Sequence, residues 1–149
     1  METSFFRSAT QNSLGARNNN PLNIRNNPAN NWQGGVIGEG GFVRFTNTTM
    51  GVRAGLIILR NYRSLHGIRT IRGTIQRFAP PNENNTMEYV RFVQNQTGLN
   101  ADLPFEFSRD NLYKIVRAMC LKESGFYLST NDFMSSWNLA FPFGTGVDW

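Results

Sequence analysis

Cysteine and histidine are almost absent from the 149-residue chain, which contains one of each, Cys120 and His66. A single cysteine excludes an intramolecular disulfide framework. One cysteine and one histidine are also too few for the usual structural zinc sites. We therefore expect a fold without disulfides, and a function that needs no metal ion or other cofactor.

Long apolar runs are absent as well. The longest, residues 56–59, is four residues long, whereas a helix needs about 20 apolar residues to cross a bilayer. The amino-terminal residues also lack the charged start and apolar stretch of a signal peptide. We expect no membrane span and synthesis in the cytoplasm without a signal peptide, so that action outside the cell would depend on another route of delivery.

Acidic residues are scarce, with 10 against 15 lysines and arginines, which gives a net charge of +5. A basic surface favours a polyanionic partner such as nucleic acid, anionic lipid or the bacterial cell wall. Charge does not distinguish among these partners. The basic residues are spread along the chain rather than gathered in one run, so we expect no nucleic-acid partner and keep nucleic-acid binding as the least favoured alternative.

Apolar periodicity predicts a mostly helical α+β fold in a single domain. One helix, over residues 49–63, is apolar around much of its circumference and should be central and buried. Further helices should begin after Thr70, at Asn85 or Thr86, and after Ser108, and the last should end at Gly125. The glycine-rich segment 32–45 predicts a short β-hairpin.

The two ends of the chain give weaker patterns. Residues 1–16 suggest a flexible leader, and Asn20 followed by Pro21 suggests the start of a short helix. The surrounding asparagines suit either turns and helix caps or contacts with a ligand. Residues 126–149 are rich in aromatic side chains without a clear period, and we expect them to pack on the domain or on a partner.

Glu123 stands out among the acidic residues because it continues an apolar stripe. It follows Met119 by four residues and Val116 by seven, so it shares their helix face. Burial, and a helix carboxyl end whose dipole disfavours an anion, both favour the protonated carboxyl. Such an acid suits the proton donor of glycosidic bond cleavage. Position alone also allows a frayed last turn with this side chain in solvent.

Glu83 is the second acidic candidate, because it lies in a loop just ahead of a helix start. It could contact that helix or serve as an alternative acid. His66 has no aspartate near it in the sequence, so we expect a loop residue rather than a general base.

Several blocks of the sequence, in the same order, resemble a family of small phage and prophage proteins described as structural or lysozyme-like. The resemblance covers roughly residues 16–125. It rests mainly on Asn18-Asn19-Asn20-Pro21-Leu22-Asn23-Ile24-Arg25, Trp32-Gln33-Gly34, Phe78-Ala79-Pro80-Pro81-Asn82-Glu83-Asn84 and Glu123-Ser124-Gly125.

A weaker likeness links residues 112–126 to the catalytic helix of lytic transglycosylases and goose-type lysozymes. In those enzymes a helix ends in Glu-Ser followed by a small residue, as in Glu123-Ser124-Gly125, and the glutamate is the general acid. That helix comes first in those enzymes and last here, so the likeness implies a circularly permuted lysozyme-like fold. The altered order keeps Glu83 as the alternative acid.

These resemblances imply a lysozyme-like domain over residues 17–125 that cleaves the glycan strand of peptidoglycan between N-acetylmuramic acid and N-acetylglucosamine. Glu123, or alternatively Glu83, would be catalytic, by hydrolysis or by transglycosylation. Substrate contacts would come from Trp32, Phe78 and Tyr89 by stacking and from Asn18, Asn23 and Asn82 by hydrogen bonding.

The enzyme would act in the cell envelope, either at lysis or as a component of the virion, with residues 126–149 available for contact with other virion proteins. The main alternative is a virion structural protein without enzymatic activity.

Overall fold

A computed structural model describes residues 13–81 and 85–147 of the chain. Its elements are, in order, α2 (Leu14–Arg17), β1 (Gly35–Ile37), the 3₁₀ turn η1 (Glu39–Gly41), β2 (Val43–Phe45), α3 (Thr48–His66), α4 (Ile71–Phe78), α5 (Thr86–Thr97), α6 (Arg109–Ser124) and α7 (Thr130–Ala140). The predicted α+β fold, mostly helical with a small hairpin, is confirmed.

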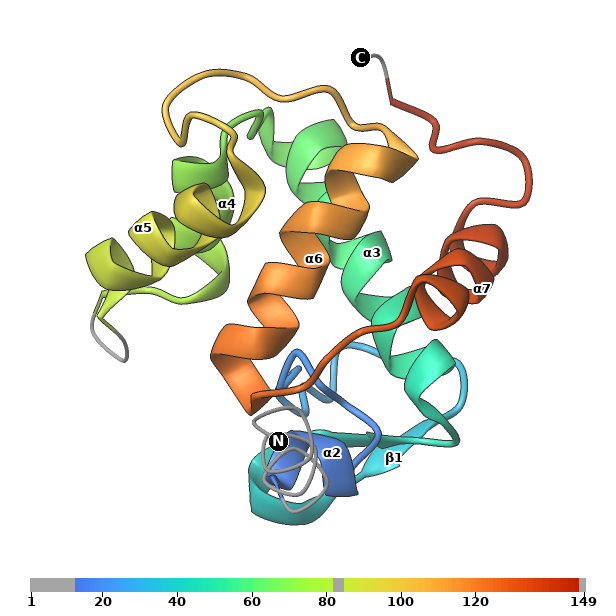
Figure 1. The fold of residues 1–149 in the computed structure, drawn as a ribbon. Helices are drawn as coiled ribbons and strands as arrows, with labels where there is room; N and C mark the ends of the chain where they lie inside the picture. Colours follow the sequence, from blue (N-terminus) through green and yellow to red (C-terminus); the bar gives the residue numbers. More distant parts are fainter. Residues whose placement is uncertain (1–12, 82–84, 148–149) are drawn as a thin grey trace.

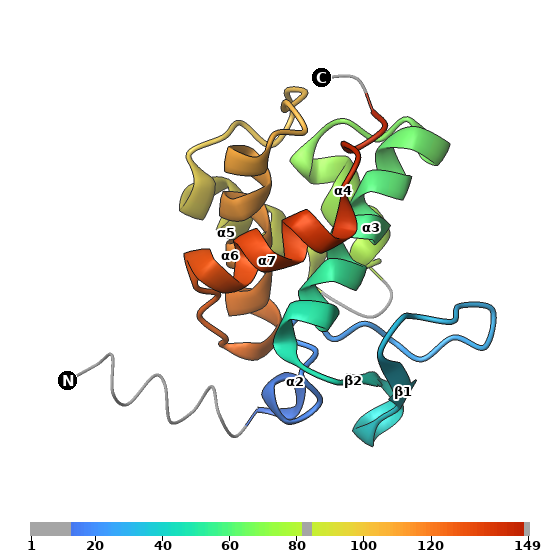
Figure 2. The same cartoon turned by 90° about the vertical axis from the view of Figure 1, so that its right-hand side faces the viewer.

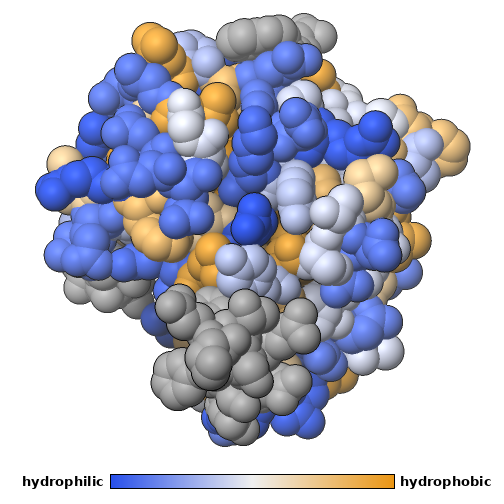
Figure 3. Space-filling view, in the orientation of Figure 1, coloured by the Kyte–Doolittle hydropathy of each residue, from blue (hydrophilic) through white to orange (hydrophobic). Residues whose placement is uncertain are grey.

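Two long helices, α3 and α6, cross in the middle of the molecule (Figure 1). The α4–α5 pair lies on one side of them and α7 on the other, while α2 and the hairpin lie at one end (Figures 1 and 2). The predicted stripes line this core, with Val52, Leu56, Leu112, Ile115 and Met119 almost fully buried. The face seen in Figure 1 is mostly hydrophilic, and apolar side chains appear on it only in small separate groups (Figure 3).

Helix ends follow the capping signals of the sequence. Thr70, Asn85 and Ser108 each accept a hydrogen bond from a main-chain N–H in the first turn of their helix. The central helix begins slightly earlier than expected, because Asn47 rather than Thr48 or Thr49 provides its cap. Gly125 ends α6 in the left-handed conformation, with φ of 61°, which a residue without a Cβ adopts at little cost.

The hairpin is antiparallel, and it pairs Gly35 with Phe45 and Ile37 with Val43. Val43 and Phe45 point into the core, whereas Arg44 between them is exposed. This alternation anchors the hairpin by one face of β2.

The helix predicted to start at Pro21 is not formed. The Asn20 side chain instead bonds to both the main-chain N–H and the carbonyl of Ile24, and to the carbonyl of Val43. It is fully buried, so it ties a turn to the hairpin rather than capping a helix.

Part of the expected leader belongs to the domain. Ser13 caps α2, and Gly15 lies so close to α6 that an added Cβ would be 2.0 Å from the Ser124 hydroxyl. The first twelve residues of the predicted leader lie outside the described residues.

The segment after Gly125 contains a helix that the sequence analysis did not predict. Helix α7 packs against α3, and Figure 2 shows it crossing in front of that helix. Phe133 and Trp137 of α7 and Phe141, directly after it, form an aromatic cluster with Phe107, in which neighbouring ring centroids are 4.8–6.2 Å apart. Residues 126–147 are therefore part of the domain, which does not end at residue 125.

None of the helices in the described ranges is long and apolar enough to cross a membrane.

Candidate functional site

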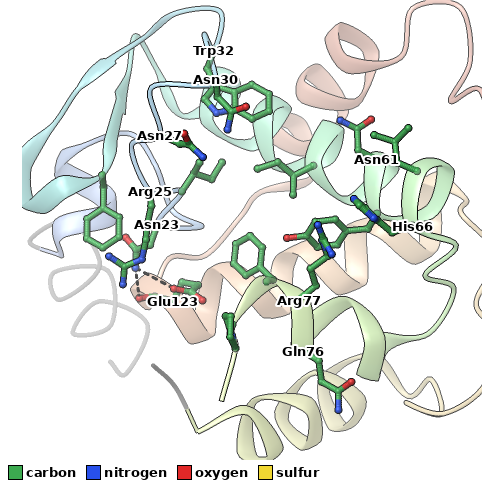
Figure 4. Close-up of a pocket in the computed structure, with 18 residues that line it drawn as sticks. Asn23, Arg25, Asn27, Asn30, Trp32, Asn61, His66, Gln76, Arg77 and Glu123 are labelled. Atoms are coloured by element: carbon green, nitrogen blue, oxygen red, sulfur yellow. Dashed lines mark hydrogen bonds between the residues drawn. The ribbon is translucent and has the colours of Figure 1, made fainter. Parts of the chain in front are cut away.

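A cleft of about 1020 Å³ opens between the loop before the hairpin and the ends of three helices (Figure 4). One wall is the loop that carries Asn23, Arg25 and Trp32, and the facing wall comes from the second half of α3. The end of α4 and the last turn of α6 complete it. The described side chains that line it are mainly amides, aromatic rings and cations: Asn23, Arg25, Asn27, Asn30, Trp32, Phe42, Asn61, Tyr62, His66, Gln76, Arg77, Phe78 and Glu123.

Glu123 reaches this cleft from the last turn of α6. The helix stops two residues later at the left-handed Gly125, and the Ser124 hydroxyl donates to the Pro21 carbonyl at 2.8 Å. The turn that bears Glu123 is thus fixed to the amino-terminal segment and is not frayed. The carboxyl itself is partly buried and faces the open space of the cleft (Figure 4).

Asn23, on the loop wall, contacts Glu123 directly. Its amide nitrogen donates to the Glu123 main-chain oxygen at 3.0 Å and to Glu123 Oε1 at 3.3 Å. Asn23 has φ of 54°, a left-handed conformation that asparagine tolerates better than most residues. The backbone turn therefore aims the amide at the end of α6.

Tyr89 of α5 lies beneath the acid. Its side chain is 3% exposed, and its hydroxyl interacts with the Glu123 carboxyl without forming a hydrogen bond of regular geometry to any described residue. Burial raises the pKa of Tyr89 well above its usual range, and the neighbouring carboxylate raises it further. The phenol therefore stays protonated and faces the acid as a donor.

Burial raises the pKa of Glu123 above its ordinary value. The opposing influences, which favour the ionised form, come in decreasing order from Tyr89, Asn23, Arg25 and Lys122. The balance leaves a carboxylic acid that gives up its proton less readily than a glutamate in water. A group of this kind can act as a general acid in a cleft.

Glu123 bears the one carboxylate among the described residues that line the cleft, whereas Arg25 and Arg77 both contribute positive charge. The Arg25 guanidinium lies 5.3 Å from the centre of the Phe42 ring, and that of Arg77 lies 5.5 Å from the centre of the Tyr62 ring. Among the described lining residues, the cleft is thus cationic around a single acid.

The structure brings four of the predicted site residues together, since Asn23, Trp32, Phe78 and Glu123 all line the cleft. Tyr89 lies under the acid, and its buried ring offers no stacking face. Asn82 and Glu83 lie outside the described residues.

Asn18 does not reach the cleft. It is fully buried and exchanges hydrogen bonds with the main chain of Glu39. Its role is to hold the turn after the hairpin strand, so the predicted substrate contact is wrong.

The sequence patterns do not indicate a site role for Tyr62 and Arg77, which both line the cleft. His66 lines it too, and the expected loop position of His66 is wrong, because it is the last residue of α3. Tyr62 and His66 are four residues apart on α3, a spacing that places both on one helix face. Arg77 directly precedes Phe78. The sequence does not specify which face of α3 packs toward the end of α4, and this arrangement places the three residues in one cleft.

In the described ranges, no three histidine, cysteine, aspartate or glutamate side chains are grouped so that they could hold a metal ion. Cys120 is fully buried, and burial raises the pKa of its thiol, which makes it a packing residue.

The chain is similar to a phage protein, Protein P5 of Pseudoalteromonas phage PM2, with 42% identity over 93 residues. The match covers 57% of this chain and 56% of the phage protein, so the chain spans about half the length of the curated relative. No family model matches the chain. The relative supports a phage origin, and its name states no activity.

Proposed function

We propose that this protein is a phage enzyme that cleaves the glycan strand of peptidoglycan between N-acetylmuramic acid and N-acetylglucosamine. The observation that carries the proposal is the Glu123 carboxyl, which is partly buried, has a raised pKa and faces a large cleft. Breaking a glycosidic bond requires such a proton donor beside the leaving oxygen.

The lining of the cleft suits a sugar chain. Trp32 and Phe78 can stack on the apolar sides of sugar rings, and the amides of Asn27, Asn30, Asn61 and Gln76 can bond to hydroxyl and acetamido groups. The rings of Phe42 and Tyr62 each have an arginine over one face. A volume of about 1020 Å³ is at the upper end of the range for small-molecule sites. It therefore favours an oligosaccharide over a single sugar.

In the proposed reaction Glu123 gives its proton to the bridging oxygen as the bond from that oxygen to the anomeric carbon of N-acetylmuramic acid breaks. The electron pair of this bond leaves with the oxygen, which becomes the new hydroxyl of N-acetylglucosamine. The anomeric carbon carries developing positive charge in this step. Glu123, now a carboxylate, is stabilised by the Asn23 amide and by the charge of Arg25.

The single carboxylate among the described cleft residues favours transglycosylation. The Glu123 carboxylate would then take the proton of the muramic acid 6-hydroxyl while that oxygen bonds to the anomeric carbon, which gives a 1,6-anhydro end. Hydrolysis differs only in that water supplies the attacking oxygen and the proton. Both routes return Glu123 to its protonated form.

The phage relative and the basic surface fit an enzyme that acts on the anionic envelope, at lysis or when carried by the virion. The almost fully exposed Phe143, at 99%, lies after α7 and is the contact that we propose for other virion proteins. A virion structural protein without activity remains the alternative that the same relative allows.

The test is release of soluble fragments from purified peptidoglycan by the wild type, Glu123→Gln and Glu83→Gln. We expect activity in the wild type and in Glu83→Gln, and a loss of at least 100-fold in Glu123→Gln, the scale of an acid–base contribution. Loss confined to Glu83→Gln would move the acid to the loop. No activity in the wild type would favour the structural alternative.

A further inference from the structure

The cleft contains an arginine whose charge no described acidic side chain balances. Within the described ranges the ion pairs join Arg17 to Glu39, Arg72 to Asp102 and Lys122 to Glu88. None of these acids lines the cleft, and Arg77 takes part in none of the pairs.

The two cleft arginines differ in their surroundings. Arg25 and Glu123 lie together at one side of the cleft, whereas Arg77 lies beside α3, toward His66 (Figure 4). The charge of Arg25 acts on the Glu123 carboxyl, so Arg25 serves the acid when it ionises. Arg77 contributes positive charge at a different place along the cleft.

The Arg77 side chain is exposed and lies against an aromatic ring. It leaves the last turn of α4, and its guanidinium lies 5.5 Å from the centre of the Tyr62 ring. Contact with the ring face orders the planar group and leaves its N–H edges available to a ligand. A guanidinium held in this way binds a carboxylate through two parallel hydrogen bonds.

We infer that Arg77 is a specificity-determining residue that binds a carboxylate of an anionic glycan, while the rest of the cleft binds the sugar rings. The inference rests on the proposed function, because Glu123 would cleave the strand that Arg77 selects. It adds that the cleft discriminates a carboxylate-bearing strand from a neutral one of the same backbone, such as chitin.

Peptidoglycan offers this chemistry from two sources. The lactyl group of N-acetylmuramic acid is a free carboxylate where the peptide has been removed, and the stem peptide has carboxylates of its own. Both would suit a guanidinium, so the probes must separate them.

The test measures binding by Glu123→Gln, which leaves the glycan uncut. The probes are a chitin oligosaccharide, peptide-free muramic acid–glucosamine strands, and the same strands with stem peptides. Arg77→Gln is added to the Glu123→Gln protein, and Arg77→Lys tests charge without the planar fork. Arg91→Gln, an exposed arginine of α5 outside the cleft lining, is the matched control.

We expect Glu123→Gln to bind at least one anionic strand more tightly than chitin, with a preference that falls as salt is added. Arg77→Gln should weaken that binding about 5-fold or more and change chitin binding less than 2-fold. Arg77→Lys should restore part of the preference, and Arg91→Gln should change nothing. An effect on the peptide-free strands would assign the carboxylate to the lactyl group, and an effect confined to the peptide-bearing strands would assign it to the stem.

Equal affinity for chitin and both anionic strands, no measurable binding of any probe, or no effect of Arg77→Gln would overturn the inference. These results are separate from failure of the proposed function. A wild type that cleaves peptidoglycan while Arg77→Gln binds normally refutes only the role of Arg77. If the wild type cleaves nothing but the protein still prefers anionic strands in an Arg77-dependent way, the carboxylate-binding role of Arg77 is supported and the proposed enzymatic activity is refuted.

Discussion

The Asn23 amide nitrogen donates to two oxygens of Glu123, the main-chain oxygen at 3.0 Å and Oε1 at 3.3 Å. One short side chain thus fixes both the end of α6 and the carboxyl that this helix presents. The two residues are 100 positions apart in the sequence. The sequence predicts a substrate contact for Asn23, whereas in the structure its amide contacts the main chain and the carboxyl of Glu123.

Replacing Asn23 by glycine should shift the pH dependence of activity. Glycine accepts the left-handed φ of 54° and removes only the amide. Because the amide favours ionised Glu123, its loss should raise the pKa of that carboxyl. The alkaline limb of the pH–rate profile, where the acid loses its proton, should move to higher pH, and kcat should fall.

Asn19→Gly is the matched control, because Asn19 has nearly the same φ, 53°, and its amide donates to the Phe45 carbonyl instead of to Glu123. It should alter stability without moving the alkaline limb. Equal shifts in both variants would mean that Asn23 acts through the fold alone.

Glu123→Gln should stabilise the fold in a pH-dependent way. The folded state raises the pKa of Glu123. Protonated Glu123 therefore contributes its full share of the stability below the unfolded pKa, and this stability is lost as pH rises through the folded pKa. The variant should therefore gain about 0.5–2 kcal/mol over the wild type at pH 8, and the gain should vanish near pH 4. Thermal unfolding across this range measures the difference.

Glu88→Gln provides a control of opposite sign. The Lys122 partner lowers the pKa of Glu88, so ionised Glu88 favours the fold above its unfolded pKa. Its replacement should cost a little stability at neutral pH and nothing in acid. If Glu123→Gln behaves like Glu88→Gln, the carboxyl of Glu123 is solvated rather than buried.

Two glycines of α3 should respond differently to alanine. At Gly51 an added Cβ would lie 2.2 Å from the Asn19 carbonyl oxygen, whereas at Gly55 it would lie 2.2 Å from Leu22 Cδ1. The backbone cannot yield as a side-chain methyl can, so Gly51→Ala should cost about 1–3 kcal/mol and Gly55→Ala less. Denaturant unfolding measures the loss of stability in each variant. Equal losses would show that the backbone at Asn19 moves away from an added Cβ as easily as the Leu22 side chain does.

Replacing a buried and an exposed phenylalanine of the carboxyl-terminal segment should have different effects on stability. Phe133 is 1% exposed in α7, and Phe143 is 99% exposed. Phe133→Ala should lower the free energy of unfolding by about 3–5 kcal/mol, and Phe143→Ser should leave it within about 0.5 kcal/mol. Thermal unfolding checks both, and a stable Phe133→Ala would mean that α7 is dispensable for the core.

Much of the architecture could be predicted because local signals agreed with tertiary packing. The caps at Thr70, Asn85 and Ser108 and the stop at Gly125 placed four helix ends correctly. The apolar stripe of α6 pointed to Glu123, which does face the cleft.

The misses have identifiable physical causes. Phe133, Trp137 and Phe141 repeat every four residues, a helical period that neighbouring serines and asparagines obscured in the sequence. Asn20 before Pro21 has the form of a cap, but its Oδ1 accepts from the main-chain N–H of Ile24 instead, while its amide nitrogen donates to the carbonyls of Ile24 and Val43.

The cleft itself depends on how α3, α4 and α6 meet, which periodicity does not specify. His66 and Arg77 could therefore not be assigned to one site with Glu123 before the fold was known.

Analysis by mass spectrometry of fragments released from purified peptidoglycan tests the central claim, the role of Glu123, most directly. We expect the wild type to release disaccharide fragments with 1,6-anhydromuramic acid ends, and Glu123→Gln, with an unchanged circular dichroism spectrum, to release almost none. Fragments with hydrated reducing ends in place of anhydro ends would mean that the route is hydrolysis, with Glu123 still the acid. Equal release by the wild type and Glu123→Gln, or no release by either, would contradict the account.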